Sequence, residues 1–146
     1  LCEKYFLWLA DLNGDDAIDV LLYAGEPWNQ LWCLEGNSGG VFHNPHFITN
    51  GIRLRNRSQV KLVDIHGDEK HDILVTIPEE NKVVLFRELR PFAYSSGETV
   101  LEEEGVEQCA LRDIDGDGYA ELLAIFPKKN ILKILNGRVW LTVNAE

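Results

Sequence analysis

Three short segments of the sequence carry oxygen-bearing side chains at a repeated spacing. They are 11–19 (DLNGDDAID), 64–72 (DIHGDEKHD) and 113–121 (DIDGDGYAE), with acidic or polar residues at positions 1, 3, 5 and 9 of each segment. Alternate residues of a tight turn direct their side chains inward, and the Gly at position 4 permits the bend. Calcium is a hard ion that takes about six to eight oxygen ligands in irregular geometry. The spacing therefore predicts calcium-binding loops.

The ligands follow from the same pattern, with a backbone carbonyl at position 7 and water completing each shell. The first and last loops offer Asp11, Asn13, Asp15, Ala17 (carbonyl) and Asp19, and Asp113, Asp115, Asp117, Tyr119 (carbonyl) and Glu121. The middle loop offers Asp64, His66, Asp68, Lys70 (carbonyl) and Asp72. Because a neutral imidazole is a poor partner for a hard ion, we expect this loop to bind most weakly or not at all, with His66 pairing with its own carboxylates.

Two other interpretations of the loops agree less well with the pattern. An EF-hand needs Gly at position 6 and Glu at position 12. Here position 6 is Asp16, Glu69 or Gly118, and position 12 is Leu22, Val75 or Ala124. Asx-type turns without a metal are the second alternative. They would leave several carboxylates in close proximity, and that repulsion is costly without a cation.

Other chemistry is less well supported by the sequence. A zinc cluster of His43, His46, His66 and His71 is not expected, because nothing brings these residues to ligand spacing and no Cys accompanies them. No G-x-S-x-G motif and no Cys with an oriented His are present, so we do not expect an enzyme. Trp28 lies in a predicted loop and is the tryptophan best placed to stack on a sugar, whereas Trp8, Trp32 and Trp140 fall in predicted strands.

The elements that must position these loops also repeat. The first Asp falls at 11, 64 and 113, so the intervals are 53 and 49 residues. Apolar residues stand two and four positions before each first Asp, which is the period of a strand with one buried face. Apolar runs follow each loop at 19–24, 72–77 and 121–126, then at 30–34, 82–86 and 131–135, and fourth strands are predicted within 41–48, 92–101 and 138–143. No helix is expected.

Each repeat therefore predicts a four-stranded antiparallel sheet of about 50 residues, which is too small to bury both of its faces. Radial stacking of such sheets gives a β-propeller, with blades at 1–53, 54–103 and 104–146. Because propellers close with about four to eight blades, we expect the chain to be part of a larger propeller or to close it with other chains. An open stack of three sheets is the alternative fold.

Composition and charge exclude several classes of partner. The formal net charge is −10, which argues against nucleic acid and anionic membrane surfaces. No apolar run approaches the length of a transmembrane helix, so no membrane insertion is expected within this chain. Cys33 and Cys109 occupy repeat positions that are apolar in the other copies, and this predicts buried thiols. Cys2 lies outside the repeat, either free or bridged to a part of the protein outside this sequence.

The three loops, each between an apolar strand and an apolar run, resemble the FG-GAP repeat of integrin α chains, also described as the VCBS repeat. The Phe-Gly/Gly-Ala-Pro signature is absent, and YAGEPW at 23–28 is its nearest counterpart. The resemblance implies a seven-bladed propeller with structural calcium in the loop between the first two strands of each blade. It implies an extracellular or cell-surface location and a role in cell adhesion.

From these observations we expect a calcium-stabilised binding, adhesion or assembly module for a protein or glycan ligand, or for further propeller blades or subunits. The propeller portion of a secreted polysaccharide-active enzyme, or a lectin, is the alternative. Asn56 opens an N-x-S sequon, the acceptor of N-glycosylation, so the chain is also predicted to be a glycoprotein.

Overall fold

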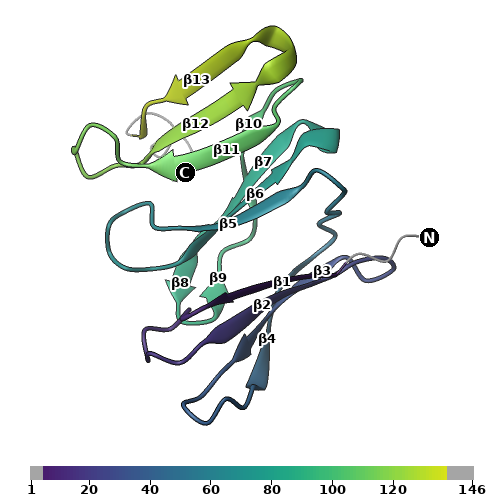
Figure 1. Cartoon of the computed structure of the whole chain (residues 1–146), viewed down its shortest axis with the longest axis vertical. Helices are drawn as coiled ribbons and strands as arrows, with labels where there is room; N and C mark the ends of the chain where they lie inside the picture. The colour runs from purple at the N-terminus through teal and green to yellow at the C-terminus, as the bar shows by residue number, and fades with distance from the viewer. Residues whose placement is uncertain (1–4, 138–146) are drawn as a thin grey trace. The chain divides into compact units, whose positions relative to one another are not determined.

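In a computed structural model, which describes residues 5–137, the chain forms thirteen β-strands and two short 3₁₀ helices within that range. The described residues form two compact units. One unit comprises residues 5–55 and 88–96, and the other comprises 56–87 and 97–137. Figure 1 shows the sheets of each unit. None of the helices within residues 5–137 is long and apolar enough to cross a membrane.

The first sheet has four antiparallel strands in the order β1-β2-β3-β4. Their bounds are Tyr5–Ala10, Asp19–Ala24, Gln30–Glu35 and His43–Asn50. The β1–β2 pairing runs from Tyr5 opposite Ala24 to Ala10 opposite Asp19. The acidic loop 11–18 therefore joins two neighbouring strands, and its ninth residue begins β2.

The second unit contains two further sheets. One has the order β10-β7-β6-β5, with bounds Glu98–Glu102, Lys82–Phe86, Asp72–Ile77 and Gln59–Val63. The other has the described order β11-β12-β13, with bounds Gln108–Arg112, Glu121–Phe126 and Ile131–Leu135. In both sheets the acidic loop again joins the first strand to the second. Each of these antiparallel sheets thus carries its acidic loop between its first two strands, as the first sheet does.

The two sheets of the second unit share one buried core. The cluster combines side chains of both sheets and of the segments beside them, and its members are Ile65, Leu74, Val83, Leu85, Val106, Cys109, Leu111, Ala120, Leu122, Ala124 and Phe126. Polar contacts add to it, because Lys61 Nζ on β5 donates to the carbonyl oxygen of Cys109 on β11 at 2.8 Å. A single small sheet cannot bury its own apolar face, and packing against the second sheet supplies the missing layer.

The turn between the second and third strands has a common ending in all three sheets. Asn29, Asn81 and Asn130 adopt φ values of 49°, 57° and 54°. Asn tolerates this left-handed region better than most residues, since its short polar side chain can bond locally. In the second and third sheets the turn is a short 3₁₀ helix, at Pro78–Glu80 and Pro127–Lys129. The conformation explains why EPWN, PEEN and PKKN recur at this place.

The segment after the third strand of the second sheet differs from the prediction of one strand within 92–101. Strands β8 (Glu88–Arg90) and β9 (Ala93–Tyr94) form a separate two-stranded ribbon, and only β10 pairs with β7. The cause is visible at Phe92, which is buried with its ring stacked on His46 at a centroid distance of 4.6 Å. This contact holds the ribbon in the first unit, so the predicted strand is divided into two.

Two other predictions have different outcomes. Buried thiols are confirmed, because Cys33 and Cys109 are 0% and 2% exposed. The predicted fourth strand at 138–143, together with Cys2 and Trp140, lies outside the described residues. The all-β class is confirmed, and two of the three predicted sheets have four antiparallel strands, whereas the third has three within the described residues. Closure into a propeller, with the three blade boundaries drawn from the repeat, stays a prediction.

Candidate metal centre

The first carboxylate of each loop holds the loop backbone in place. Asp11 accepts four backbone N–H groups, including those of Gly14 at 2.7 Å and Asp16 at 2.9 Å. Asp113 accepts the N–H groups of Gly116 and Gly118 at 2.7 and 2.9 Å, and Asp64 is bonded in the same way within the middle loop. The loop is therefore shaped by its own hydrogen bonds, as in an Asx-type turn.

The fifth position continues this pattern. Asp15, Asp68 and Asp117 each accept the backbone N–H of the residue at position 7, at distances of 2.8, 3.2 and 2.9 Å. Position 4 is a Gly with positive φ in every loop, which is the conformation that the bend requires. Position 6 also has positive φ. That the carbonyl oxygens of Ala17, Lys70 and Tyr119 bind a metal stays a prediction.

The ninth position has a role that the sequence did not predict. Asp19 is fully buried, and its two oxygens accept the N–H groups of Leu12 at 2.7 Å and Gly36 at 2.8 Å. Glu121 is 3% exposed and accepts the N–H groups of Ile114 at 2.9 Å and Gly137 at 3.3 Å. The ninth carboxylate thus ties the loop to the turn after the third strand, and its share in metal ligation stays a prediction.

The middle loop follows the same plan at this position. Asp72 is 3% exposed and accepts the N–H of Ile65 at 3.4 Å. Buried carboxylates are tolerated when they accept strong hydrogen bonds. A sequence shows the acidic residue but not the backbone N–H groups that donate to it. The sequence analysis therefore missed that the ninth carboxylate binds the loop backbone.

The third loop is the one in which three carboxylates converge. Oxygen atoms of Asp113, Asp115 and Asp117 all lie within 4.8 Å of one another, and this group can hold a metal ion. Glu121, the fourth acid assigned to this loop, is not a member of the group. Hard carboxylate oxygens suit hard divalent cations. The arrangement is exposed to solvent on one side, because Asp113 and Asp115 are exposed.

The electrostatics of this cluster favour a cation. The backbone N–H of Gly118 is the main cause of a lowered pKa at Asp113. At Asp115 the N–H of Asp117 acts to lower the pKa, but desolvation and the charges of Asp117, Glu121 and Asp113 outweigh it, and the pKa is raised. Desolvation is the largest of the causes that raise this pKa, and the neighbouring carboxylates add repulsion between like charges. A bound cation would relieve that repulsion.

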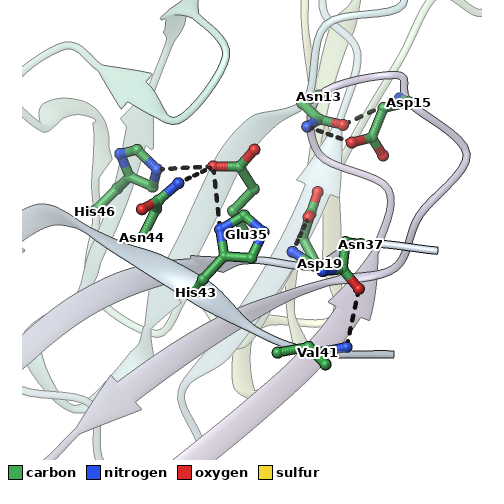
Figure 2. A network of polar contacts seen from close by, with 10 residues as sticks. Asn13, Asp15, Asp19, Glu35, Asn37, Val41, His43, Asn44 and His46 are labelled. Carbon is green, nitrogen blue, oxygen red and sulfur yellow. Dashed lines mark hydrogen bonds and ion pairs between the residues drawn. The ribbon is translucent and has the colours of Figure 1, made fainter. Parts of the chain in front are cut away.

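The first loop replaces one carboxylate with an amide. Figure 2 shows the Asn13 side chain facing Asp15, with Nδ2 donating to Asp15 Oδ2 at 3.1 Å. Burial acts to raise the pKa of Asp11, but the N–H bonds from Asp16 and its neighbours outweigh it, and the pKa is lowered. The loop therefore brings two carboxylates and one amide together, with less negative charge than the third loop has.

The middle loop contains its own cation. Lys70 Nζ lies 3.6 Å from Asp68 Oδ2. His66 contributes its backbone N–H to Asp64 at 3.2 Å. Within residues 5–137, the side chain that forms an ion pair with these carboxylates is that of Lys70 rather than the expected His66. The ammonium group of Lys70 competes with a metal ion for the Asp68 carboxylate. This competition is a physical reason to expect that the middle loop binds calcium weakly.

A second polar cluster lies on the first sheet and was not expected. Glu35 Oε2 accepts from Asn44 Nδ2 at 3.1 Å and lies 3.9 Å from His43 Nδ1 and 3.7 Å from His46 Nε2 (Figure 2). The pairing of β3 with β4 shifts register next to Glu35, which allows His43 and His46 to approach one carboxylate. Sequence spacing alone hides this shift. Within the described residues, only the three aspartates meet the geometry of a metal group.

Two further predicted sites are exposed. The side chain of Trp28 is 54% exposed, in the turn between β2 and β3. Asn56 is exposed in a turn before β5. Glycosylation of Asn56 stays a prediction, although the position is accessible to the modification.

Comparison with known proteins does not identify a family for the chain, so the proposed metal site depends on the chemistry of the three aspartates. No protein-family model and no curated protein matches the chain.

Proposed function

We propose that the chain is a calcium-stabilised segment of a β-propeller that acts as a non-catalytic binding, adhesion or assembly module. The observation that carries the proposal is the convergence of Asp113, Asp115 and Asp117 in a loop that recurs between the first two strands of each of the three larger sheets. Repeated loops of this kind stabilise a stack of small sheets, because each ion neutralises carboxylates next to two strands.

Calcium is the ion that the oxygen set favours. Calcium takes about six to eight oxygen ligands and tolerates irregular geometry. The oxygens of Asp113, Asp115 and Asp117 come from one tight loop, and they lie close enough together to share one cation. Magnesium needs shorter bonds of about 2.1 Å and strict octahedral geometry. Imidazole and thiolate ligands, which favour zinc and copper, are absent from this group of three aspartates.

The proposed location is extracellular or at the cell surface, in the secretory pathway. The third loop is open to solvent, because two of its three converging aspartates are exposed. Sites in extracellular modules bind at about 10⁻⁴ to 10⁻³ M, a concentration of calcium found outside cells. The exposed sequon residue Asn56 agrees with this location.

Calcium binding is tested by thermal unfolding of the purified chain. Calcium should raise the melting temperature and EDTA should lower it, because a ligand that binds only the folded state stabilises it. Asp115→Asn keeps a hydrogen-bond acceptor for the N–H of Asp117 but removes a charge. We expect this variant to be at least as stable as wild type in EDTA and to lose most of the calcium response.

The matched control is Asp68→Asn in the middle loop, where Lys70 already supplies a cation. It should leave the calcium response of the chain nearly unchanged. A melting temperature that is the same in calcium and in EDTA would remove the basis of the proposal. A response to magnesium equal to that of calcium would reject the choice of ion.

A lectin is the second candidate, and the exposure of Trp28 favours it. Trp28 is 54% exposed, and an exposed indole ring is a suitable stacking surface for a sugar. The turn is well fixed, because Tyr23 Oη donates toward Asn29 Oδ1 at 3.0 Å and accepts the N–H of Leu54 at 3.1 Å. Trp28→Ala should abolish glycan-array binding by a lectin, whereas an array without any signal for wild type would reject this candidate.

A further inference from the structure

The chain presents two exposed apolar surfaces, one on its first sheet and one on its third, and both correspond to surfaces that are buried between the second and third sheets. In that internal interface, the second sheet with its loop contributes Ile65, Val83 and Leu85, which are 1%, 0% and 0% exposed. The third sheet with its loop contributes Cys109, Leu111 and Ala120, which are 2%, 9% and 1% exposed. The internal interface therefore joins two different sets of repeat positions.

The residues of the third sheet that repeat the first set are exposed. The interval between the second and third repeats is 49 residues, so Ile65, Val83 and Leu85 correspond to Ile114, Leu132 and Ile134. These three side chains are 51%, 57% and 53% exposed. Leu132 and Ile134 alternate along β13 and so lie on one side of it. We call this set the third-sheet face.

The residues of the first sheet that repeat the second set are exposed as well. The first and third loops are 102 residues apart, so Cys109, Leu111 and Ala120 correspond to Leu7, Leu9 and Ile18. These side chains are 66%, 67% and 52% exposed. Leu7 and Leu9 alternate along β1 on one side of that strand. We call this set the first-sheet face.

The two faces are therefore the two halves of one kind of interface, both present on a single chain. A large apolar patch at equivalent positions on a sheet marks a surface that is normally covered. Two third-sheet faces cannot pack on each other in the same way, because the internal interface joins two different sets of repeat positions. The same holds for two first-sheet faces. Its complement is the face of the other kind, which a second copy of the chain supplies.

We propose that the chain self-associates head to tail, with the third-sheet face of one copy packing on the first-sheet face of the next as the second sheet packs on the third. The inference rests on the proposed role as an assembly module and names its partner as another copy of this chain. An interface between different surfaces is heterologous, so it forms rings or open chains of copies rather than a symmetric pair.

Residue identities suggest how this contact differs from the internal one. Leu7 and Ile18 are bulkier than Cys109 and Ala120, so the two copies must lie further apart than the internal sheets, and separate molecules are free to do so. The position that corresponds to Lys61 on β5 is Ala110 on β11. The hydrogen bond from Lys61 to Cys109 has therefore no counterpart between copies, and the contact is held mainly by apolar burial.

The test uses one variant for each face. Leu9→Glu blocks the first-sheet face and Leu132→Glu blocks the third-sheet face, because burial of an unpaired carboxylate is costly. Leu89→Glu is the control with the same charge change, on a side chain that is 63% exposed and belongs to neither face. Analytical ultracentrifugation of each protein in calcium, at concentrations up to about 100 μM, detects micromolar association.

We expect wild type and Leu89→Glu to sediment above the monomer mass of 16.6 kDa as concentration rises. Each blocked variant alone should remain a monomer, and their equimolar mixture should give a dimer, because each retains the face that the other lacks. Should a blocked variant lose its native circular dichroism, Leu9→Asn and Leu132→Asn replace it.

Two results would overturn the proposal. A wild-type chain that stays monomeric throughout shows that another partner, such as further sheets of a longer polypeptide, covers these faces. A blocked variant that still associates alone shows that the contact does not pair the two faces. Neither result bears on calcium binding, which the melting experiment tests separately.

Discussion

At the scale of single residues, the acids of one loop divide into two groups by what their oxygens meet. Asp113, Asp115 and Asp117 converge on a solvent-exposed point, whereas Glu121 is buried against backbone N–H groups. Asp19 repeats the second behaviour in the first loop. The same residue type therefore serves ion binding at one position and backbone bonding at another, and the two roles can be separated by substitution.

Asp19→Asn should destabilise the folded chain even without calcium. The amide replaces one acceptor oxygen with an NH₂ group, so either Leu12 or Gly36 loses its buried partner. Loss of a buried, charge-assisted hydrogen bond costs about 2 kcal/mol. Asp15→Asn is the control, because Asp15 is exposed and the amide keeps an acceptor for the N–H of Ala17, so its effect should stay below about 0.5 kcal/mol.

The measurement is urea unfolding of both variants and wild type in EDTA. If Asp15→Asn is the more damaging of the two under these conditions, the buried carboxylate does not hold the loop as described.

The site could be predicted from the sequence in part, and the reason lies in what a sequence displays. Residue types and spacing are visible, so the repeated loops and their acids were found. Hydrogen-bond donors of the backbone are not visible, so the role of Asp19 and Glu121 was missed. The contacts of Glu35 with His43 and His46 depend on a register shift between β3 and β4, which no spacing reveals.

At the scale of elements, the third strand and the acidic loop approach closely through one residue. The N–H of Gly36, directly after β3, donates to Asp19, and a Cβ atom at this position would overlap the carbonyl oxygen of Ile18. Gly137 has the same relation to Glu121 and the Ala120 carbonyl. The turn after the third strand therefore requires a residue without a side chain.

Gly36→Ala should destabilise the chain by about 3 kcal/mol, the sum of a strained close contact and a weakened hydrogen bond to a charged group. Gly39→Ala, in the same turn, is the control, since its added methyl group would meet only the Asn37 side chain, at 3.2 Å. Chemical denaturation compares the two. Equal losses for both variants would contradict the close approach at Gly36.

The elements were predicted well where the repeat was regular and poorly where one copy departs from it. Apolar alternation and the acidic loops placed the first three strands of each sheet close to their observed bounds. The segment 88–96 broke the pattern, because the burial of Phe92 on His46 is a contact between residues distant in sequence. Local periodicity carries no information about such a partner.

At the scale of the whole molecule, two buried thiols make the free energy of unfolding depend on pH in the alkaline range. Burial raises the pKa of Cys33 from its ordinary value of 9.0 to about 12 and that of Cys109 to about 11. Burial also raises the pKa of Tyr23. In the unfolded chain these groups lose their protons at lower pH than in the folded chain, so alkaline pH favours unfolding.

Stability should be insensitive to the thiols below pH 9.0 and should fall as pH rises toward about 12, where the folded thiols also ionise. Each unit of difference in pKa corresponds to about 1.4 kcal/mol. A variant with Cys33→Val and Cys109→Val keeps both buried positions apolar, as the corresponding Phe86 and Val60 of the second sheet are. Unfolding free energies between pH 8 and about 11 should fall less steeply for this variant; parallel curves would contradict the prediction.

One contact in the first loop has a consequence for the chemical ageing of the protein. Asn13 precedes Gly14, and an Asn-Gly pair in a flexible chain loses its amide when the backbone nitrogen of Gly attacks the Asn side chain. Here the N–H of Gly14 is bonded to Asp11 at 2.7 Å and the Asn13 amide is held by Asp15. The folded loop therefore protects Asn13 from deamidation, whereas an unfolded chain would convert it to an acid. Conversion to aspartate would give the first loop the three acids that Asp113, Asp115 and Asp117 supply in the third.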